Sequence, residues 1–112
     1  MTLSVSVFIT TYFNMGAITP RFIRDVINEI LNIDISEKTR LRGYSDARAI
    51  YYVLCSKYTT YSLEEIGKQV NRHHASVLHC INNVFPVINK SLYTVLNSRF
   101  REIIKEEYTI TN

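Results

Sequence analysis

A capping box followed by a turn and a second apolar segment constrains the fold of this chain more than any other sequence feature. Ser62 and Glu65 form an S-x-x-E pattern, whose side chains satisfy backbone N–H groups at a helix start. Gly67 lies within that helix and is small enough to let another helix approach closely. Residues 71–73 are predicted to turn, and a further helix is predicted to begin near His74. Two short helices joined by a tight turn are typical of a helix-turn-helix unit.

Apolar residues at helical spacing predict helices in most of the remaining chain. Thr19 offers an N-cap hydroxyl and Pro20 occupies the first turn, so a helix is predicted to start there. The polar stretch 34–45 is predicted to be a loop, after which Asp46 or the serine before it caps another helix. Pro86 is predicted to end or kink the helix that begins near residue 74. The predicted fold class is therefore an all-α helical bundle. The predicted inward-facing residues are Phe22, Ile23, Val26, Ile27, Ile30, Leu31, Ala47, Ile50, Tyr51, Leu54, Tyr58, Leu63, Ile66, Val70, Val77, Leu78, Ile81, Val84, Leu92, Val95, Leu96, Phe100, Ile103 and Ile104.

The N-terminal segment has a different pattern from the rest of the chain. Apolar and polar residues alternate over residues 3–9, which predicts a short strand. No second strand is evident to pair with it, so an ordered arm or an oligomer contact is the alternative interpretation. The predicted organisation is an N-terminal arm at residues 1–18, which is either extended or a strand, and a helical domain at residues 19–112.

The size and charge of the chain favour one basic domain. Its 112 residues suffice for a single modest core, and its net charge of +3 suggests an anionic partner. The basic residues Lys38, Arg40, Arg42 and Arg48 gather around a single acid, Asp46. No apolar run is long enough to span a bilayer, so no membrane partner is predicted.

The start of the second helix in the helix-turn-helix unit is a candidate surface for reading DNA. In such units this helix enters the major groove with its N-terminal residues at the base edges. Here residues 72–76 occupy that position, and they are rich in hydrogen-bonding side chains. These residues are Arg72, His73, His74, Ala75 and Ser76.

Three motifs resemble those of a known family. The chain reads A-R-A-I-Y-Y-V-L at 47–54, S-L-E-E-I-G at 62–67 and R-H-H-A-S-V-L-H at 72–79. This combination is similar to the C-terminal DNA-binding domain of the bacterial replication initiator DnaA, over roughly residues 19–107. The resemblance implies a helical bundle, related in its helix-turn-helix to the Trp repressor, that binds short duplex boxes. It also implies a basic loop that inserts arginine into the minor groove.

The resemblance carries roles onto individual residues. Arg40 aligns with the minor-groove arginine of the family, and Arg42 is expected to share its loop. Arg48 aligns with an arginine at the DNA surface, and His74 aligns with a base-contacting histidine. Ser76 retains a hydroxyl for phosphate, and a further histidine at the end of the third motif is expected near the backbone. The full set of predicted DNA-binding residues is Arg40, Arg42, Arg48, Arg72, His73, His74, Ala75, Ser76 and His79.

Two departures from the family pattern predict an altered target sequence. The family has aspartate where this chain has His73, and threonine where it has Ala75. Aspartate only accepts hydrogen bonds, as from cytosine or adenine amino groups, whereas histidine can also donate to guanine or phosphate. Alanine lacks both the hydroxyl and the methyl group with which threonine could contact thymine. Duplex binding is therefore expected to persist with a different preferred sequence.

Catalytic and metal-binding interpretations are weaker. No G-x-x-x-x-G-K-[ST] motif occurs, and the chain has three glycines, so neither nucleotide binding nor ATPase activity is predicted and a free-standing binding domain is expected. Cys55 and Cys80 lie in apolar helical patterns and are expected to be reduced core thiols. His73, His74 and His79, with Cys80, are poorly spaced for zinc ligands on one helix. No enzyme activity, cofactor or metal is therefore predicted.

The sequence is compatible with more than one biological setting. Double-stranded DNA is the predicted partner, with replication initiation or its regulation as the predicted role, in a cytoplasmic, nucleoid-associated protein or in a phage-encoded protein in the host cytoplasm. Transcriptional repression is one alternative. A helical adaptor that binds a host replication or transcription protein is another, and a homo-oligomer is compatible with either.

Overall fold

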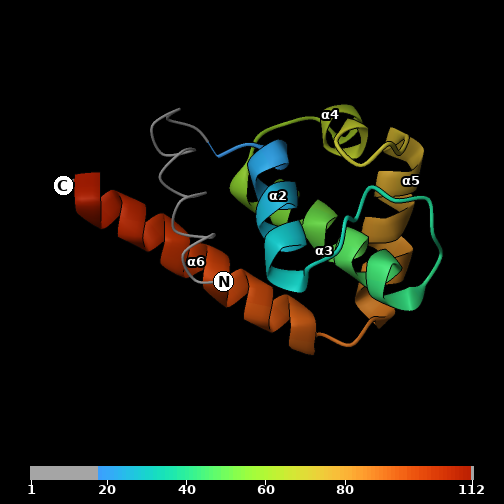
Figure 1. Ribbon diagram of the computed structural model, residues 1–112. Helices are drawn as coiled ribbons and strands as arrows, with labels where there is room; N and C mark the ends of the chain where they lie inside the picture. Colours follow the sequence, from blue (N-terminus) through green and yellow to red (C-terminus); the bar gives the residue numbers. More distant parts are fainter. Residues whose placement is uncertain (1–17, 112) are drawn as a thin grey trace. The chain divides into compact units, whose positions relative to one another are not determined.

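Helices form every regular element of the part of the chain that the structure describes. The computed structural model describes the backbone of residues 18–111 and the side chains of residues 18–104 (Figure 1). The predicted strand at residues 3–9 lies outside the described residues. The described elements contain no strand, and the all-α prediction is confirmed. They are α2 (Pro20–Leu31), α3 (Arg42–Tyr58), α4 (Leu63–Lys68), α5 (His74–His79), a π-helical segment (Cys80–Val84), a 3-10 turn (Phe85–Val87) and α6 (Ser91–Thr111).

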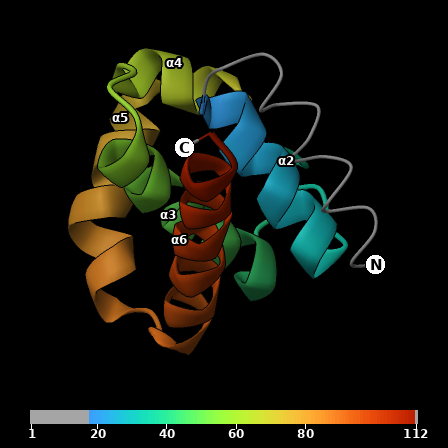
Figure 2. The ribbon, with the colours of Figure 1, turned by 90° about the vertical axis from the view of Figure 1, so that its left-hand side faces the viewer.

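The chain divides into two compact units, which are described separately. Residues Ile18–Ile88 form the first unit, and α6 belongs to the second. In the first unit α3 is the central element, contacted by α2, by α4 and by the π-helical segment (Figures 1 and 2). The residues of α3 that are buried by these contacts include Ala47, Ala49, Ile50, Tyr51, Tyr52, Leu54 and Cys55.

Helix α2 starts and ends through side-chain chemistry that its sequence predicts. The hydroxyl of Thr19 accepts a hydrogen bond from the Phe22 amide at 3.1 Å, and Pro20 occupies the first turn. The helix ends at Asn32, whose φ of 55° is in the left-handed region and whose N–H donates to the Asn28 carbonyl. Asparagine tolerates this conformation better than most residues, so the chain leaves α2 cleanly at this point.

Helix α3 begins earlier than the sequence predicts. Its first residue is Arg42, and the carbonyl of Leu41 accepts hydrogen bonds from the amides of Tyr44 and Ser45 at 3.0 Å each. No side chain caps this end, so the helix starts without the serine or aspartate cap that the sequence suggested. The expectation that Arg42 lies in the preceding loop is therefore wrong, because the residue lies in the first turn of α3.

The helix-turn-helix unit has the predicted geometry. The hydroxyl of Ser62 accepts from the Glu65 amide at 3.2 Å and caps α4. The Arg72 amide donates to the Gly67 carbonyl at 2.9 Å, and the chain turns through Asn71, whose φ is 58°. A Cβ atom added to Gly67 would lie 2.5 Å from the Arg72 carbonyl oxygen. The close approach predicted at Gly67 is thus confirmed, with the turn as well as the next helix as neighbours.

The second helix of the unit is less regular than its sequence suggests. Helix α5 has six residues and continues as the π-helical segment and then as the 3-10 turn that contains Pro86. The change of geometry at Pro86 agrees with the predicted kink, whereas the earlier π-helical segment was not predicted. Leu78 was predicted to face the core, but it is 47% exposed. Only Val77 of α5 is buried, and Leu78, the next residue, lies about 100° further around the helix axis and so on a different face.

Helix α6 carries a buried apolar face. Leu96, Phe100 and Ile103 are buried and recur at helical spacing, as predicted. Val95 was predicted to face inward but is exposed, since it lies on a different face of the helix. None of the described helices combines the length and apolar character that crossing a bilayer requires.

A buried hydroxyl links the central helix to the helix-turn-helix unit, and its removal gives a testable prediction. The Tyr51 hydroxyl donates to the Ile66 carbonyl at 2.7 Å, and burial raises the pKa of Tyr51, which keeps the donor protonated. Tyr51→Phe retains the ring but removes this partner, so the free energy of unfolding should fall by about 1–3 kcal/mol. Urea denaturation measures the change. Tyr61→Phe, at an exposed tyrosine, is the matched control, and an equal effect of both changes would contradict the prediction.

Candidate nucleic-acid interface

The predicted reading residues lie together on the surface at the start of α5. His73, His74, Ala75 and Ser76 are all exposed. His73 is the N-cap residue, but its side chain makes no capping hydrogen bond, and its carbonyl accepts from the amides of Ser76 and Val77. The imidazole of His73 is therefore not used by the helix end and remains available to a ligand.

His79 lies one turn further along the same helix. It is exposed, and its Nδ1 accepts a hydrogen bond from the side-chain amide of Asn83 at 3.2 Å. Cys80, which follows it, is half-buried, and burial raises the pKa of its thiol. Burial also raises the pKa of the Cys55 thiol. Both changes oppose formation of the thiolate that a nucleophilic cysteine needs.

The segment between α2 and α3, residues 32–41, forms what we call the basic loop. Side chains hold its first half. The side-chain oxygen Oδ1 of Asn28 accepts a hydrogen bond from the Ile35 amide at 2.9 Å. The Asp34 carboxylate accepts from the amide and the hydroxyl of Ser36, which lowers the pKa of Asp34. Ile35 is fully buried and anchors the loop to the core. The second half of the loop carries Lys38 and Arg40, both exposed.

Arg48 lies beneath this loop and not on the outer surface. Its side chain is buried, with the residue only 7% exposed. Its guanidinium donates to three loop carbonyls: Ile35 at 3.0 Å, Glu37 at 3.3 Å and Thr39 at 2.7 Å. The expected position of Arg48 at the DNA surface thus needs correction, because most of its fork is occupied by the protein backbone. Burial, and then the positive charge of Arg72, lower the pKa of Arg48.

Arg72 connects the same loop to the turn of the helix-turn-helix unit. It donates to the carbonyls of Val70 at 2.7 Å and Asn71 at 3.4 Å within the turn. Across the chain, its other terminal nitrogen donates to the Glu37 carbonyl at 3.1 Å. The half-buried Arg72 therefore links the basic loop to the helix-turn-helix turn, a connection that the sequence pattern did not predict.

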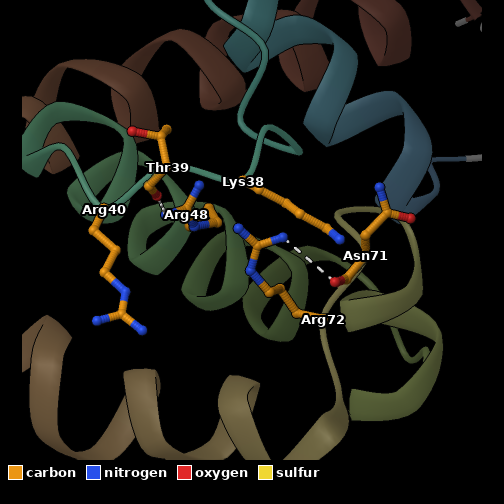
Figure 3. Close-up of a pocket in the computed structure, with 6 residues that line it drawn as sticks. All are labelled: Lys38, Thr39, Arg40, Arg48, Asn71 and Arg72. Carbon is orange, nitrogen blue, oxygen red and sulfur yellow. Dashed lines mark hydrogen bonds between the residues drawn. The ribbon is translucent and has the colours of Figure 1, made fainter.

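An open pocket of about 430 Å³ separates the basic loop from the turn (Figure 3). Lys38 extends toward Arg72 and Asn71, whereas Arg40, two residues further along the loop, extends away from them. Within the described part of the chain, none of the four cationic residues at this pocket makes an ion pair. Such a concentration of positive charge without carboxylates favours an anionic ligand. The residues that line the pocket are Lys38, Thr39, Arg40, Arg48, Asn71 and Arg72.

Sequence reasoning identified most of this site but not all of it. Arg42 was assigned to the loop, yet it lies in α3 and its Nε is 3.9 Å from the Asp46 carboxylate. Thr39 and Asn71 were not singled out, although both line the pocket. An asparagine beside the predicted turn is a usable signal for Asn71, since that residue type tolerates positive φ. No sequence signal pointed to Thr39.

These features define a class of protein. A short capped helix, a tight turn and a second helix with exposed polar residues at its start make a helix-turn-helix protein, here with a cationic loop beside the turn. The family model described as bacterial dnaA protein helix-turn-helix matches residues 21–84, and the chain belongs to that family.

Two curated relatives agree with this assignment. The chromosomal replication initiator protein DnaA of Lachnoclostridium phytofermentans is 37% identical over 81 residues, which are 69% of this chain and 18% of the relative. DnaA of Oleidesulfovibrio alaskensis is 37% identical over 62 residues, which are 55% of this chain and 13% of the relative. The chain therefore matches less than a fifth of either relative's length. No solved structure shows a significant match.

Proposed function

We propose that this protein binds double-stranded DNA in a sequence-selective manner, in replication initiation or its regulation. In this proposal, the start of α5 reads the major groove and Arg40 of the basic loop enters the adjacent minor groove. The observation that carries the proposal is the arrangement of the two elements. A pocket lined by four cationic residues lies between the basic loop, which carries the exposed Arg40, and the turn that leads into the exposed, polar start of α5. Membership of the DnaA helix-turn-helix family supports the same function.

The position of the pocket supports an assignment to the sugar–phosphate backbone of a duplex. Neighbouring major and minor grooves are separated by one sugar–phosphate strand, so a protein that enters both must face that strand. Lys38 and Arg72 line the pocket and have no acidic partner among the described residues, and in this proposal they face that strand. We assign the pocket to a backbone phosphate. Phosphate contacts of this kind set the register of a protein on DNA, and base contacts add selectivity.

Base reading is assigned to α5 and to Arg40. His74 is exposed at the first position of α5, and an imidazole offers ring nitrogens for hydrogen bonds to base edges. The Ser76 hydroxyl adds a donor and acceptor for base or phosphate. Arg40 is expected to favour A·T-rich flanks, because a narrow minor groove has an enhanced negative potential that attracts arginine.

Salt dependence separates this function from that of a protein-interaction adaptor. If about four phosphates are neutralised, duplex affinity should fall roughly tenfold for each doubling of salt. Fluorescence anisotropy with a labelled duplex, from low to physiological salt, measures the slope. Failure to bind any duplex at low salt would contradict the proposal and favour the adaptor.

Selection of bound duplexes from a random pool tests the assigned roles. The unaltered protein should enrich one sequence motif. Arg40→Ala should lose the A·T preference at one flank, and His74→Ala should lose preference at central positions. Arg21→Ala is the matched control, because it removes an exposed positive charge from α2, outside the proposed interface. Enrichment of no motif by the unaltered protein would contradict sequence-selective reading.

A further inference from the structure

The basic loop is fastened from two sides by arginines that belong to different elements. From α3, Arg48 donates to the carbonyls of Ile35, Glu37 and Thr39. From the helix-turn-helix turn, Arg72 donates to the Glu37 carbonyl. The carbonyl of Glu37 is thus a shared acceptor, with Arg48 Nη1 at 3.3 Å and Arg72 Nη2 at 3.1 Å. Hydrogen bonds within the loop also hold this stretch: the Glu37 amide donates to the Asp34 carbonyl at 3.1 Å and the Thr39 amide donates to the Glu37 carbonyl at 3.0 Å, but neither bond ties the loop to another element.

We propose that Arg48 and Arg72 are positioning residues. They set the distance between Arg40, which enters the minor groove, and α5, which reads the major groove. This inference rests on the proposed function. It explains how Arg40 and α5 can contact the two grooves at the same time. Arg40 follows Thr39 directly, and the shortest hydrogen bond from Arg48 to the loop, at 2.7 Å, ends on the Thr39 carbonyl. Arg72 immediately precedes the α5 N-cap. Bonds at these two residues therefore transmit the position of one groove contact to the other.

The geometry requires arginine and not merely positive charge. Arg48 reaches three carbonyls spread over five residues of loop, using both terminal nitrogens of its planar fork. A lysine ammonium is a single point on a flexible stem and is more strongly hydrated, so it is a poor substitute at a buried site with several acceptors. A residue that contacted phosphate only as a charge would tolerate lysine far better. The two roles therefore predict opposite results for the same substitution.

A double-mutant cycle between Arg48 and Arg40 tests the inference. Arg48→Lys should weaken binding to the selected duplex by about tenfold and remove the A·T preference at the flank, as Arg40→Ala does. In the Arg40→Ala background, Arg48→Lys should change affinity by less than about twofold, because the loop no longer has a groove contact to position. Equal effects of Arg48→Lys in both backgrounds would overturn the inference. So would unchanged affinity in Arg48→Lys, since charge alone would then suffice.

Controls separate positioning from folding and from the proposed function itself. Circular dichroism and thermal melting establish whether each variant folds. If Arg48→Lys does not fold, the same double-mutant cycle is measured with Arg72→Lys and Arg40→Ala, because Arg72 is only half-buried. Arg21→Lys makes the same chemical change at an exposed site on α2 and should leave affinity unaltered. Duplex binding with additive effects overturns this inference alone, whereas absence of duplex binding by the unaltered protein overturns the proposed function.

Discussion

Gly67→Ala is expected to destabilise the protein by about 2–3 kcal/mol. The added Cβ would lie 2.5 Å from the Arg72 carbonyl oxygen, 3.3 Å from its carbonyl carbon and 2.9 Å from Cγ2 of Val77. The first two of these neighbours are backbone, which cannot move without displacing the turn. The Gly67 carbonyl also accepts the Arg72 amide at 2.9 Å, so a shift of the turn would strain that bond as well.

Thermal melting and urea denaturation measure this effect. The melting temperature should drop by about 10 °C or more in a chain of this size. Gly43→Ala is the matched control, because a Cβ at Gly43 in the first turns of α3 meets no atom within 4 Å. Alanine there should be neutral or stabilise by up to about 1 kcal/mol, by restricting the unfolded chain. Equal stability of the two variants would show that the turn does not pack on Gly67 as described.

The double substitution His73→Asp with Ala75→Thr is expected to change which duplex the protein prefers. Both residues are exposed at the start of α5, so neither change disturbs the core. The pair restores the residue types that the DnaA pattern has at these positions. Each well-placed base contact discriminates by about 1–3 kcal/mol. The affinity for the duplex box that DnaA initiators usually bind (the usual initiator box) should therefore rise roughly thirtyfold or more relative to the affinity for the duplex that the unaltered protein prefers.

Competition between the usual initiator box and the duplex selected by the unaltered protein measures the change. Lys68→Ala, at an exposed residue in the last turn of α4, is a control for altered charge within the helix-turn-helix unit and should leave the ratio unchanged. Melting curves are needed as well, because aspartate at the N-cap should also stabilise α5 by about 1 kcal/mol. An unchanged ratio in a folded double variant would refute base reading by these two positions.

Local chemistry made much of the fold predictable from the sequence. The caps at Thr19 and Ser62 form as predicted, since each depends on atoms within three residues of the helix start. The turn after α4 is equally local, and the close approach at Gly67 followed from its missing side chain. The motifs at 47–54, 62–67 and 72–79 also led to the DnaA family, which the family match confirms.

The wrong predictions concern the exposure of a side chain and the first residue of a helix. Leu78 was assigned to the core by its spacing, but a six-residue α5 buries only Val77. Arg42 was assigned to the loop because Ser45 and Asp46 resemble caps. The Leu41 carbonyl takes that role through backbone bonds alone, which no pattern of side chains reveals.

The sequence by itself determined the helical class, the helix-turn-helix unit and the identity of the polar residues at its second helix, because each depends on neighbours along the chain. Only the tertiary structure decided what Arg48 and Arg72 do. The sequence predicted both as cations that contact DNA, Arg48 in the basic stretch and Arg72 beside the second helix, yet their guanidinium groups meet on the Glu37 carbonyl. A carbonyl has no sequence signature, since every residue carries one. Which carbonyls a guanidinium reaches is therefore determined by how the elements pack together.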